Sequence, residues 1–336
     1  MSTEHTNLDQ APILQVDNIK AYYELLAGSV RAVDDVSFTL QQGEILGIAG
    51  ESGCGKSTLA AVLSTVILPP LRLIGGKLLT KDGKSVFELK ERALRKEIRG
   101  KYIALIPQSA MNCLNPTKKI KDLILDAIRA HQPRRPKSEI MKIATQQFTD
   151  LGLQPGALNS YFFELSGGMK QRAVIAISSL LNPKVLIADE PTVALDVSTQ
   201  KAVLDLLIGL RRKGIVQSLI FITHDIAVLR QVADRIMVMY AGMVVEEGPT
   251  EEVVFKPLHP YTAALISTVI VPELDIKKKV LAGIPGAPPN LKNPPPGCRF
   301  HPRCRSATQK CQQEVPPLIK KGDRAVRCWN YDEGTS

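Results

Sequence analysis

The sequence lacks any long hydrophobic run. Its longest candidate, 173–181, falls well short of the roughly 20 apolar residues that a membrane-spanning helix needs, and Ser178 and Ser179 interrupt it. The first ten residues also lack the basic and then apolar segments of a secretory signal. We therefore expect a soluble chain that reaches a membrane only through partner proteins.

Aromatic residues are scarce, at 5% of the chain, whereas basic residues are plentiful. The formal net charge of +10 is compatible with nucleic acid or with anionic lipid head groups as a partner. The basic clusters at 90–101, 134–137 and 277–279 lack the interleaved aromatic residues that single-stranded nucleic-acid binders use. Solvated faces near a negatively charged membrane explain the charge as well, and we expect no nucleic-acid partner.

A phosphate-binding loop is the first positive feature. Residues 50–57 read GESGCGKS and match G-x-x-x-x-G-K-[ST], between an apolar strand pattern at 44–49 and a helical run at 58–63. The glycines let backbone N–H groups point at phosphate oxygens, and the helix N-terminus adds a favourable dipole. In this motif Lys56 reaches the β- and γ-phosphates, and Ser57 places its hydroxyl on Mg²⁺. The loop therefore predicts ATP and Mg²⁺ binding through Gly50, Ser52, Gly53, Cys54, Gly55, Lys56, Ser57 and Thr58, with Cys54 most simply a small filler.

Two carboxylates follow a second buried strand pattern. Residues 185–190 read VLIADE, an apolar run of the kind that forms a buried parallel strand with its carboxyl end at the site. Asp189 is the expected Mg²⁺ ligand. Glu190 is the expected base that orients the attacking water, because phosphoryl transfer depends mainly on positioning and charge stabilisation. An acidic pair at a strand end is more often only solvated, but together with the phosphate loop it predicts nucleotide hydrolysis.

The segment 165–172, LSGGMKQR, resembles the signature sequence of ATP-binding cassette (ABC) proteins. A serine hydroxyl and glycine amides at a helix start form an anion site. The resemblance implies that Ser166, Gly167 and Gly168 contact the γ-phosphate of nucleotide bound to a second cassette. Because no internal repeat is apparent, the second cassette must be another chain.

Further residues fit this resemblance, which covers 13–248. It implies that Gln108 contacts Mg²⁺ and the attacking water and lies near the membrane subunits. It also implies that 194–196 form the loop that crosses between cassettes, and that His224 is the switch histidine at the γ-phosphate.

The resemblance is less definite at two places. Tyr23 resembles the aromatic residue that stacks on adenine, with Tyr22 as the alternative. Val193 departs from the family, because many members carry a small polar residue there; we expect little effect.

The order of patterns predicts an α/β fold. Apolar strands alternate with amphipathic helices, as in a parallel sheet covered by helices. With 336 residues and 44% hydrophobic content, the chain is expected to form more than one unit. We expect a P-loop NTPase of the ABC type, with a RecA-like core and a β subdomain, an inserted helical subdomain, and a small irregular, cysteine-stapled C-terminal domain. The predicted boundaries are 1–111 with 177–248, then 112–176 with the signature, and 249–336.

Helical stripes at 120–130 and 138–151 are expected to form core packing in the inserted subdomain. The prolines of the QPRRP segment at 132–136 separate the two helices.

The composition changes after residue 248. Seven prolines fall within 284–302, which argues against regular helix or sheet there. Four of the six cysteines follow within 31 residues, separated by five, six and sixteen positions: Cys298, Cys304, Cys311 and Cys328. Such a segment has little to bury, so we expect these thiols to staple it.

Three interpretations compete for the thiols. Disulfides are disfavoured in a reducing cytosol. A structural zinc would use four thiolates, but the usual C-x₂₋₄-C spacing is missing. A four-cysteine iron–sulfur cluster tolerates wide spacing, because each thiolate binds a separate iron. The spacing leaves zinc and cluster open.

A second resemblance bears on this choice. The runs 259–261 (HPY), 284–289 (IPGAPP) and 297–304 (GCRFHPRC) resemble the C-terminal extension of ATPase subunits from dipeptide and oligopeptide importers. Some members of that group hold a [4Fe–4S] cluster on these cysteines, which the resemblance implies here. His301 is a further candidate ligand.

The resemblances together imply the ATP-hydrolysing subunit of a bacterial or archaeal peptide importer at the cytoplasmic face of the membrane. They imply a related but different second ATPase chain, two permease subunits and an extracytoplasmic peptide-binding protein. Two alternatives remain: the same role with nickel or sugar cargo, and a soluble ABC ATPase acting on nucleic acid, which only the positive charge supports.

Overall fold

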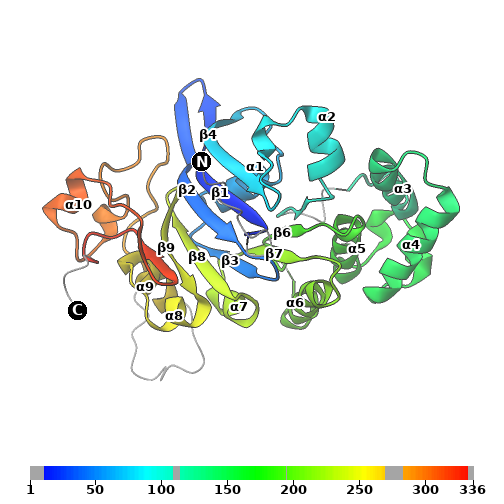
Figure 1. Cartoon of the computed structure of the whole chain (residues 1–336). Coiled ribbons are helices and arrows are strands. Elements are labelled where there is room, and N and C mark those ends of the chain that lie inside the picture. Colours follow the sequence, from blue (N-terminus) through cyan, green and yellow to red (C-terminus); the bar gives the residue numbers. More distant parts are fainter. Residues whose placement is uncertain (1–10, 109–113, 194, 269–282, 332–336) are drawn as a thin grey trace. The chain divides into compact units, whose positions relative to one another are not determined.

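The computed structural model describes residues 11–108, 114–193, 195–268 and 283–331. The chain divides into two compact units: unit 1 consists of Met1–Ser85 with Phe221–Ser336, and unit 2 of Val86–Ile220 (Figure 1). The division falls within strand β7 (Ser218–Ile222). The Ser218 amide donates to Lys184 of unit 2, whereas Thr223, just after the strand, donates to Ile48 of unit 1.

Unit 1 contains a three-stranded antiparallel sheet in the order β2-β1-β4, drawn in blue and cyan in Figure 1. Alternation in β1 buries Leu14 and Val16, so one face of the strand packs inward as a period of two requires. The strands are β1 (Leu14–Leu25), β2 (Gly28–Leu40) and β4 (Leu71–Thr80).

A second set of strands in unit 1 is ordered β10-β11-β9-β8-β3. All five residues of β3 are buried, and this strand runs parallel to β8. The remaining pairs, β8 with β9, β9 with β11 and β11 with β10, are antiparallel. The sheet is therefore mixed at this edge, whereas the sequence pattern predicted a parallel sheet. The bounds are β3 (Ile45–Ala49), β8 (Arg235–Tyr240), β9 (Met243–Pro249), β10 (Ile319–Lys321) and β11 (Arg324–Val326).

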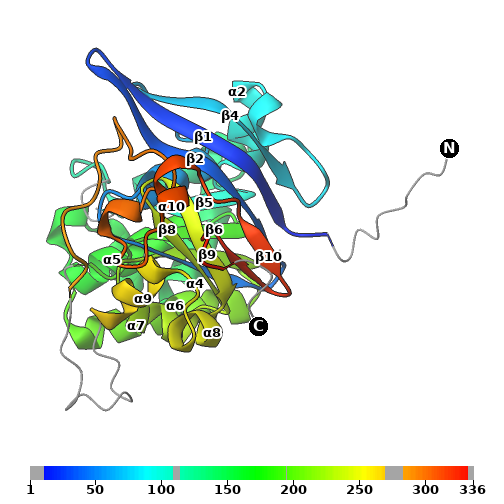
Figure 2. The ribbon, with the colours of Figure 1, turned by 90° about the vertical axis from the view of Figure 1, so that its left-hand side faces the viewer.

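The C-terminal extension thus adds strands to the cassette. Figure 2 shows β10 in red at the outer edge of the sheet that holds β8 and β9 in yellow. Between 283 and 300 the described chain forms neither helix nor strand, as the prolines predict. The helices of unit 1 are α1 (Lys56–Leu63), α7 (Ile226–Val232), α8 (Thr250–Phe255), α9 (Pro260–Ser267) and α10 (Gln309–Gln313).

Unit 2 pairs β5 (Ile103–Ile106) in parallel with β6 (Val185–Asp189). Its longer helices, green in Figure 1, confirm the two predicted stripes, because Ile124 of α3 and Phe148 of α4 are fully buried. The helices are α2 (Glu91–Ala93), α3 (Ile120–His131), α4 (Lys137–Asp150), α5 (Gly167–Ser179) and α6 (Val197–Arg212). None of the helices in the described ranges is long and apolar enough to span a bilayer.

Four arginines fasten the C-terminal extension to the rest of unit 1. Each side chain is at most 13% exposed, and each forms an ion pair with a carboxylate that precedes the extension. Because removing one member leaves a charge buried and unpaired, such pairs fix the position of the segment that carries them. The pairs are Arg299–Asp34, Arg303–Glu51, Arg324–Glu246 and Arg327–Asp35.

Replacing Arg324 tests this attachment. Glu246 is fully buried and lies 2.7 Å from the Arg324 guanidinium, so Arg324→Ala leaves a buried carboxylate without its cation. We expect the free energy of unfolding to fall by about 3 kcal/mol in urea denaturation. The exposed Arg305→Ala is the control and should change it by less than about 0.5 kcal/mol. Equal stability of the two variants would contradict the structural role of the pair.

Candidate functional site

The phosphate loop begins where β3 ends. Its backbone approaches other backbone so closely that side chains are excluded at two glycines. A Cβ on Gly50 would lie 2.3 Å from the Met239 carbonyl oxygen, and one on Gly55 would lie 2.0 Å from that of Ala32. Gly55 also has φ of 107°, a left-handed conformation that glycine adopts without strain. The loop geometry therefore requires glycine at these positions.

Charged and polar groups of the loop gather at its start and at the first turn of α1. Lys56 is 5% exposed, and its Nζ donates to the carbonyl oxygens of Gly50 at 2.7 Å and Glu51 at 3.1 Å. Ser52, Gly53 and Ser57 are exposed, so this part of the loop is accessible to a ligand. The loop thus combines a fixed ammonium with an open surface.

The structure gives the two tyrosine candidates different neighbours. The hydroxyl of Tyr23 lies 3.1 Å from the Oγ1 of Thr58 on α1. Tyr22 instead donates to the carboxylate of Asp34 at 2.7 Å, and burial together with this bond raises the pKa of Tyr22 to about 12. Tyr23 is therefore the tyrosine that contacts the helix following the loop.

His224 is exposed at the carboxyl end of β7, just before α7. The preceding Thr223 donates its amide to Ile48 on β3, so His224 follows directly from a residue paired with the strand that leads into the loop. Asp225 caps α7 by accepting from the amide of Ala227 at 2.8 Å, which fixes the backbone after the histidine.

Unit 2 brings the predicted carboxylates and glutamine to one edge. Asp189 ends β6 and is 4% exposed, and Gln108 follows β5 by two residues. Because β5 and β6 are parallel, with Ile106 opposite Ala188, their carboxyl ends share an edge. Glu190 has φ of 49°, a left-handed conformation that is strained for a side chain of this kind and is found at functional sites.

The signature segment forms the start of α5. The Ser166 hydroxyl caps the helix by accepting from the amide of Met169 at 3.4 Å, and Gly167 and Gly168 are the first helical residues. A Cβ on Gly168 would lie 3.4 Å from the methyl of Thr199, so this helix start lies beside that of α6.

The crossing loop predicted at 194–196 is described only in part, because Ala194 lies outside the described residues. Asp196 caps α6 by accepting from the amide of Thr199 at 3.0 Å. The Ser198 hydroxyl, followed by the groups of Thr199, holds the pKa of Asp196 well below its ordinary value. Val193, the departure from the family pattern, is 44% exposed.

The predicted nucleotide residues therefore fall into two groups. Unit 1 carries Tyr23, the phosphate loop and His224, whereas unit 2 carries Gln108, the signature residues, Asp189 and Glu190.

The four C-terminal cysteines are free thiols within unit 1. The amide of Cys298 donates to the carbonyl of Cys311 at 2.8 Å, an approach that Gly297 permits because a Cβ there would lie 2.4 Å from that oxygen. Burial raises the pKa of Cys298 to about 11, and the charges that Cys311, Cys328 and Cys304 would carry add to the rise. The backbones of Cys298 and Cys311 are therefore in direct contact.

The four cysteines have the right donor atoms for a metal site, but their side chains do not converge on one point. Four thiols suit zinc or an iron–sulfur cluster. Within the described residues, however, no three His, Cys, Asp or Glu side chains converge closely enough to hold a metal ion. A cluster separates its thiolates over several irons, so it fits a spread set better than a single ion does.

Two residues that the motifs did not indicate, Arg303 and Tyr261, contact the phosphate loop. Glu51, at a free position of the motif, pairs with Arg303, and its amide donates to the hydroxyl of Tyr261 at 2.8 Å. The available signal was the arginine beside Cys304 in a segment otherwise rich in proline. An arginine that becomes buried needs a carboxylate partner to compensate its charge. The sequence does not show which carboxylate that is.

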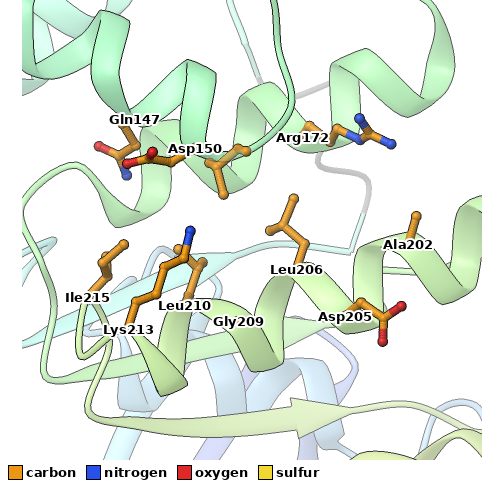
Figure 3. A pocket seen from close by; sticks show the side chains of 11 residues that line it. Gln147, Asp150, Arg172, Ala202, Asp205, Leu206, Gly209, Leu210, Lys213 and Ile215 are labelled. Carbon is orange, nitrogen blue, oxygen red and sulfur yellow. The ribbon is translucent and has the colours of Figure 1, made fainter.

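A cavity of about 320 Å³ lies in unit 2, apart from the predicted site residues. Figure 3 shows Gln147 and Asp150 of α4 on one side and Leu206 of α6 on the other, with Lys213 pointing across the gap. Its lining contains none of the predicted nucleotide contacts of unit 2. The cavity is therefore not the site that the motifs predict.

The two loop glycines at 53 and 55 offer a matched test of the loop geometry. Both have positive φ, so alanine incurs a strain of about 1–2 kcal/mol at either position. Only Gly55→Ala also drives a Cβ into the Ala32 carbonyl, whereas a Cβ on Gly53 meets nothing within 4 Å. We expect the melting temperature of Gly55→Ala to lie more than about 4 °C below that of Gly53→Ala, without nucleotide. Equal melting temperatures would contradict the close approach.

Two family models match the chain. The family model "ABC transporter" matches residues 33–193, and the model "Oligopeptide/dipeptide transporter, C-terminal region" matches 245–311. The dipeptide transport ATP-binding protein DppD of Caldanaerobacter subterraneus subsp. tengcongensis is 43% identical over 96% of this chain and 98% of its own length. The oligopeptide transport ATP-binding protein OppD of Bacillus subtilis is 39% identical over 94% of this chain and 88% of its own length.

Solved structures extend the comparison. A dimeric, post-hydrolysis structure of an ATP-binding cassette bound to ADP and Pi matches with a TM-score of 0.62 and 27% identity, over 70% of this chain and 98% of that one. A component of an ABC transporter complex from Clostridium perfringens matches with the same TM-score and identity, over 74% and 92%. The chain therefore belongs to the ATP-binding cassette family of transporter ATPases, in its group of dipeptide and oligopeptide transport ATP-binding proteins.

Proposed function

We propose that the chain is the ATP-hydrolysing subunit of a membrane importer for di- and oligopeptides. The observation that carries the proposal is the extent of the similarity to peptide transport ATP-binding proteins. It covers 96% of the chain and therefore includes the C-terminal region beyond the cassette. No feature of the described structure favours a second function. A nucleic-acid partner is supported only by the positive net charge of the sequence.

The residues of unit 1 bind the triphosphate in this proposal. The loop amides and Lys56 contact the phosphates, and Tyr23 stacks on adenine. The buried Lys56, held at the start of the loop, provides a fixed positive charge for the β- and γ-phosphates. His224 contacts the γ-phosphate, and it lies two residues before the start of α7.

The residues of unit 2 act on the attacking water and on the partner. Glu190 orients and polarises the water, and its left-handed backbone is of the kind found at functional sites. Gln108 and Asp189 of this unit, with Ser57 of the phosphate loop in unit 1, would hold Mg²⁺, which neutralises charge on the β- and γ-phosphates when bound. The amides at the start of α5 face the nucleotide of a second cassette, so hydrolysis requires two chains.

The assembly that follows is peripheral to the membrane. We propose a heterodimer with a related ATPase chain on the cytoplasmic face, two permease subunits contacted near Gln108, and an extracytoplasmic peptide-binding protein. We retain the division into a core of 1–111 with 177–248, a helical subdomain of 112–176 and an extension of 249–336 as part of the proposal.

A [4Fe–4S] cluster on the four cysteines completes the proposal. Burial raises the pKa of Cys298, Cys304 and Cys328, so these thiols are protonated at neutral pH until a bound metal compensates their charge. A bound cluster would cross-link Cys298, Cys304, Cys311 and Cys328, and zinc is the alternative.

Glu190→Gln tests the assignment of the base. It keeps the shape of the side chain but removes the carboxylate, so we expect ATP hydrolysis by the assembled transporter to fall by about 100-fold or more, with ATP binding retained. Phosphate release and nucleotide affinity should be measured on the same preparation. The exposed Glu164→Gln of unit 2 is the control. Undiminished hydrolysis in Glu190→Gln would remove Glu190 from the mechanism.

Iron, acid-labile sulfide and zinc analysis of the anaerobically purified chain tests the cluster. We expect about four iron and four sulfide per chain, lost in the Cys298→Ser/Cys304→Ser variant. Stoichiometric zinc without sulfide would replace the cluster with the alternative site and leave the cassette chemistry intact.

The cargo is tested with the whole transporter. A tagged chain should recover hydrophobic permease subunits and a second ATPase, and vesicles containing this complex should accumulate a labelled dipeptide or oligopeptide in an ATP-dependent way. Uptake of nickel or sugar instead would change the cargo. ATPase activity stimulated by DNA or ribosomes would overturn the transport function.

A further inference from the structure

Glu51 places an acidic side chain inside a loop that binds phosphate. It occupies one of the free positions of the motif, next to Gly50 and five residues before Lys56. A carboxylate there repels the negatively charged phosphates of ATP unless a cation compensates it.

Arg303 of the C-terminal extension supplies that cation. Its guanidinium contacts both carboxylate oxygens of Glu51, at 2.7 and 3.0 Å, which is the bidentate geometry of a strong, directional pair. The side chains of Arg303 and Glu51 are 6% and 22% exposed, so the pair is partly shielded from solvent. The Arg303 Nε donates to the Pro285 carbonyl at 2.7 Å, and its Nη1 lies 3.3 Å from the Tyr240 hydroxyl. Pro285 of the extension and Tyr240 of β8 therefore hold the guanidinium in the position in which it pairs with Glu51.

Tyr261 holds the backbone of the same loop residue. Its hydroxyl accepts the Glu51 amide at 2.8 Å, and its fully buried ring packs against Tyr240 and Phe300 with centroids 4.5 and 5.3 Å away. The amide of Tyr261 donates to His259 Nδ1 at 3.0 Å. Burial lowers the pKa of His259 to about 3, which keeps this acceptor neutral.

Glu51 is thus held at three points, and the third is Lys56. The Lys56 Nζ donates to the Glu51 carbonyl at 3.1 Å, so a shift of Glu51 moves an acceptor of the lysine that binds the phosphates. All of these contacts lie within unit 1. Through them Glu51 connects Arg303 and Tyr261 of the C-terminal extension with Lys56.

We propose that Arg303 and Tyr261 are positioning residues of the nucleotide site, with Arg303 neutralising Glu51 and both residues fixing the loop around Lys56. The C-terminal extension then contributes to ATP affinity, beyond fastening itself to the cassette. This inference rests on the proposed ATP-binding function and assigns a further part of that site.

Equilibrium binding of ATP to the purified full chain tests the proposal, in a Glu190→Gln background that prevents turnover. We expect Arg303→Ala to raise the dissociation constant by about tenfold to 100-fold, because the loop carboxylate is left uncompensated and free to move. The effect should shrink at high ionic strength, as charge repulsion does. Arg305→Ala removes the same charge from an exposed position two residues further on and should stay within about twofold of the parent.

A second substitution separates this role from a merely structural one. Adding Glu51→Gln to Arg303→Ala removes the repelling charge and should recover most of the ATP affinity, although it restores no contact with the extension. If Arg303→Ala fails to fold, Tyr261→Phe decides. It removes only the hydroxyl that accepts the Glu51 amide, so it should weaken ATP binding while the chain stays folded, with its melting temperature measured beside that of the parent.

Parental affinity in folded Arg303→Ala or in Tyr261→Phe would overturn the proposal, as would an Arg303→Ala/Glu51→Gln variant that binds no better than Arg303→Ala. A parent chain that does not bind ATP at all would instead overturn the proposed function.

Discussion

The pairing of buried arginines with carboxylates is the interaction on which the arrangement of unit 1 depends. Arg299, Arg303, Arg324 and Arg327 all lie in a segment that has few apolar side chains of its own and many prolines. An unpaired charge in the interior is strongly unfavourable, so each arginine has one acceptable location for its head group. Four such constraints along one segment determine its path over the cassette, and one of them ends on the phosphate loop at Glu51.

The phosphate loop depends on a second constraint, the closeness of its backbone to neighbouring strands. Gly50 and Gly55 lie against carbonyl groups that leave no room for a Cβ. In unit 2 the comparable feature is Glu190, whose left-handed backbone holds the predicted base at the end of β6. The phosphate loop and Glu190 thus both have unfavourable backbone conformations. Each follows a fully buried strand, β3 or β6, which holds it in place.

The sequence predicted those features that arise from local spacing. The strand, loop and helix around Gly50, the helices at 120–131 and 137–150, and the capped start of α5 all follow from patterns within about 20 residues, because periodicity and capping are short-range effects. It did not predict β10 and β11, because two three-residue strands carry little periodic signal and form only through pairing with β9. The antiparallel pairing of β8 with β9 was also missed, because the periodicity along a strand does not show the direction of its neighbour.

By itself the sequence determined the ATP-binding chemistry and the family, since the loop, the strand ending in Asp189 and the signature are contiguous motifs that can be recognised from neighbouring residues alone. Tertiary structure alone decided what holds the loop. Arg303 and Glu51 are 252 positions apart, and each is an unremarkable charged residue in its own segment. Only folding brings them together, because no local pattern can indicate which of many arginines will meet which carboxylate once both leave water.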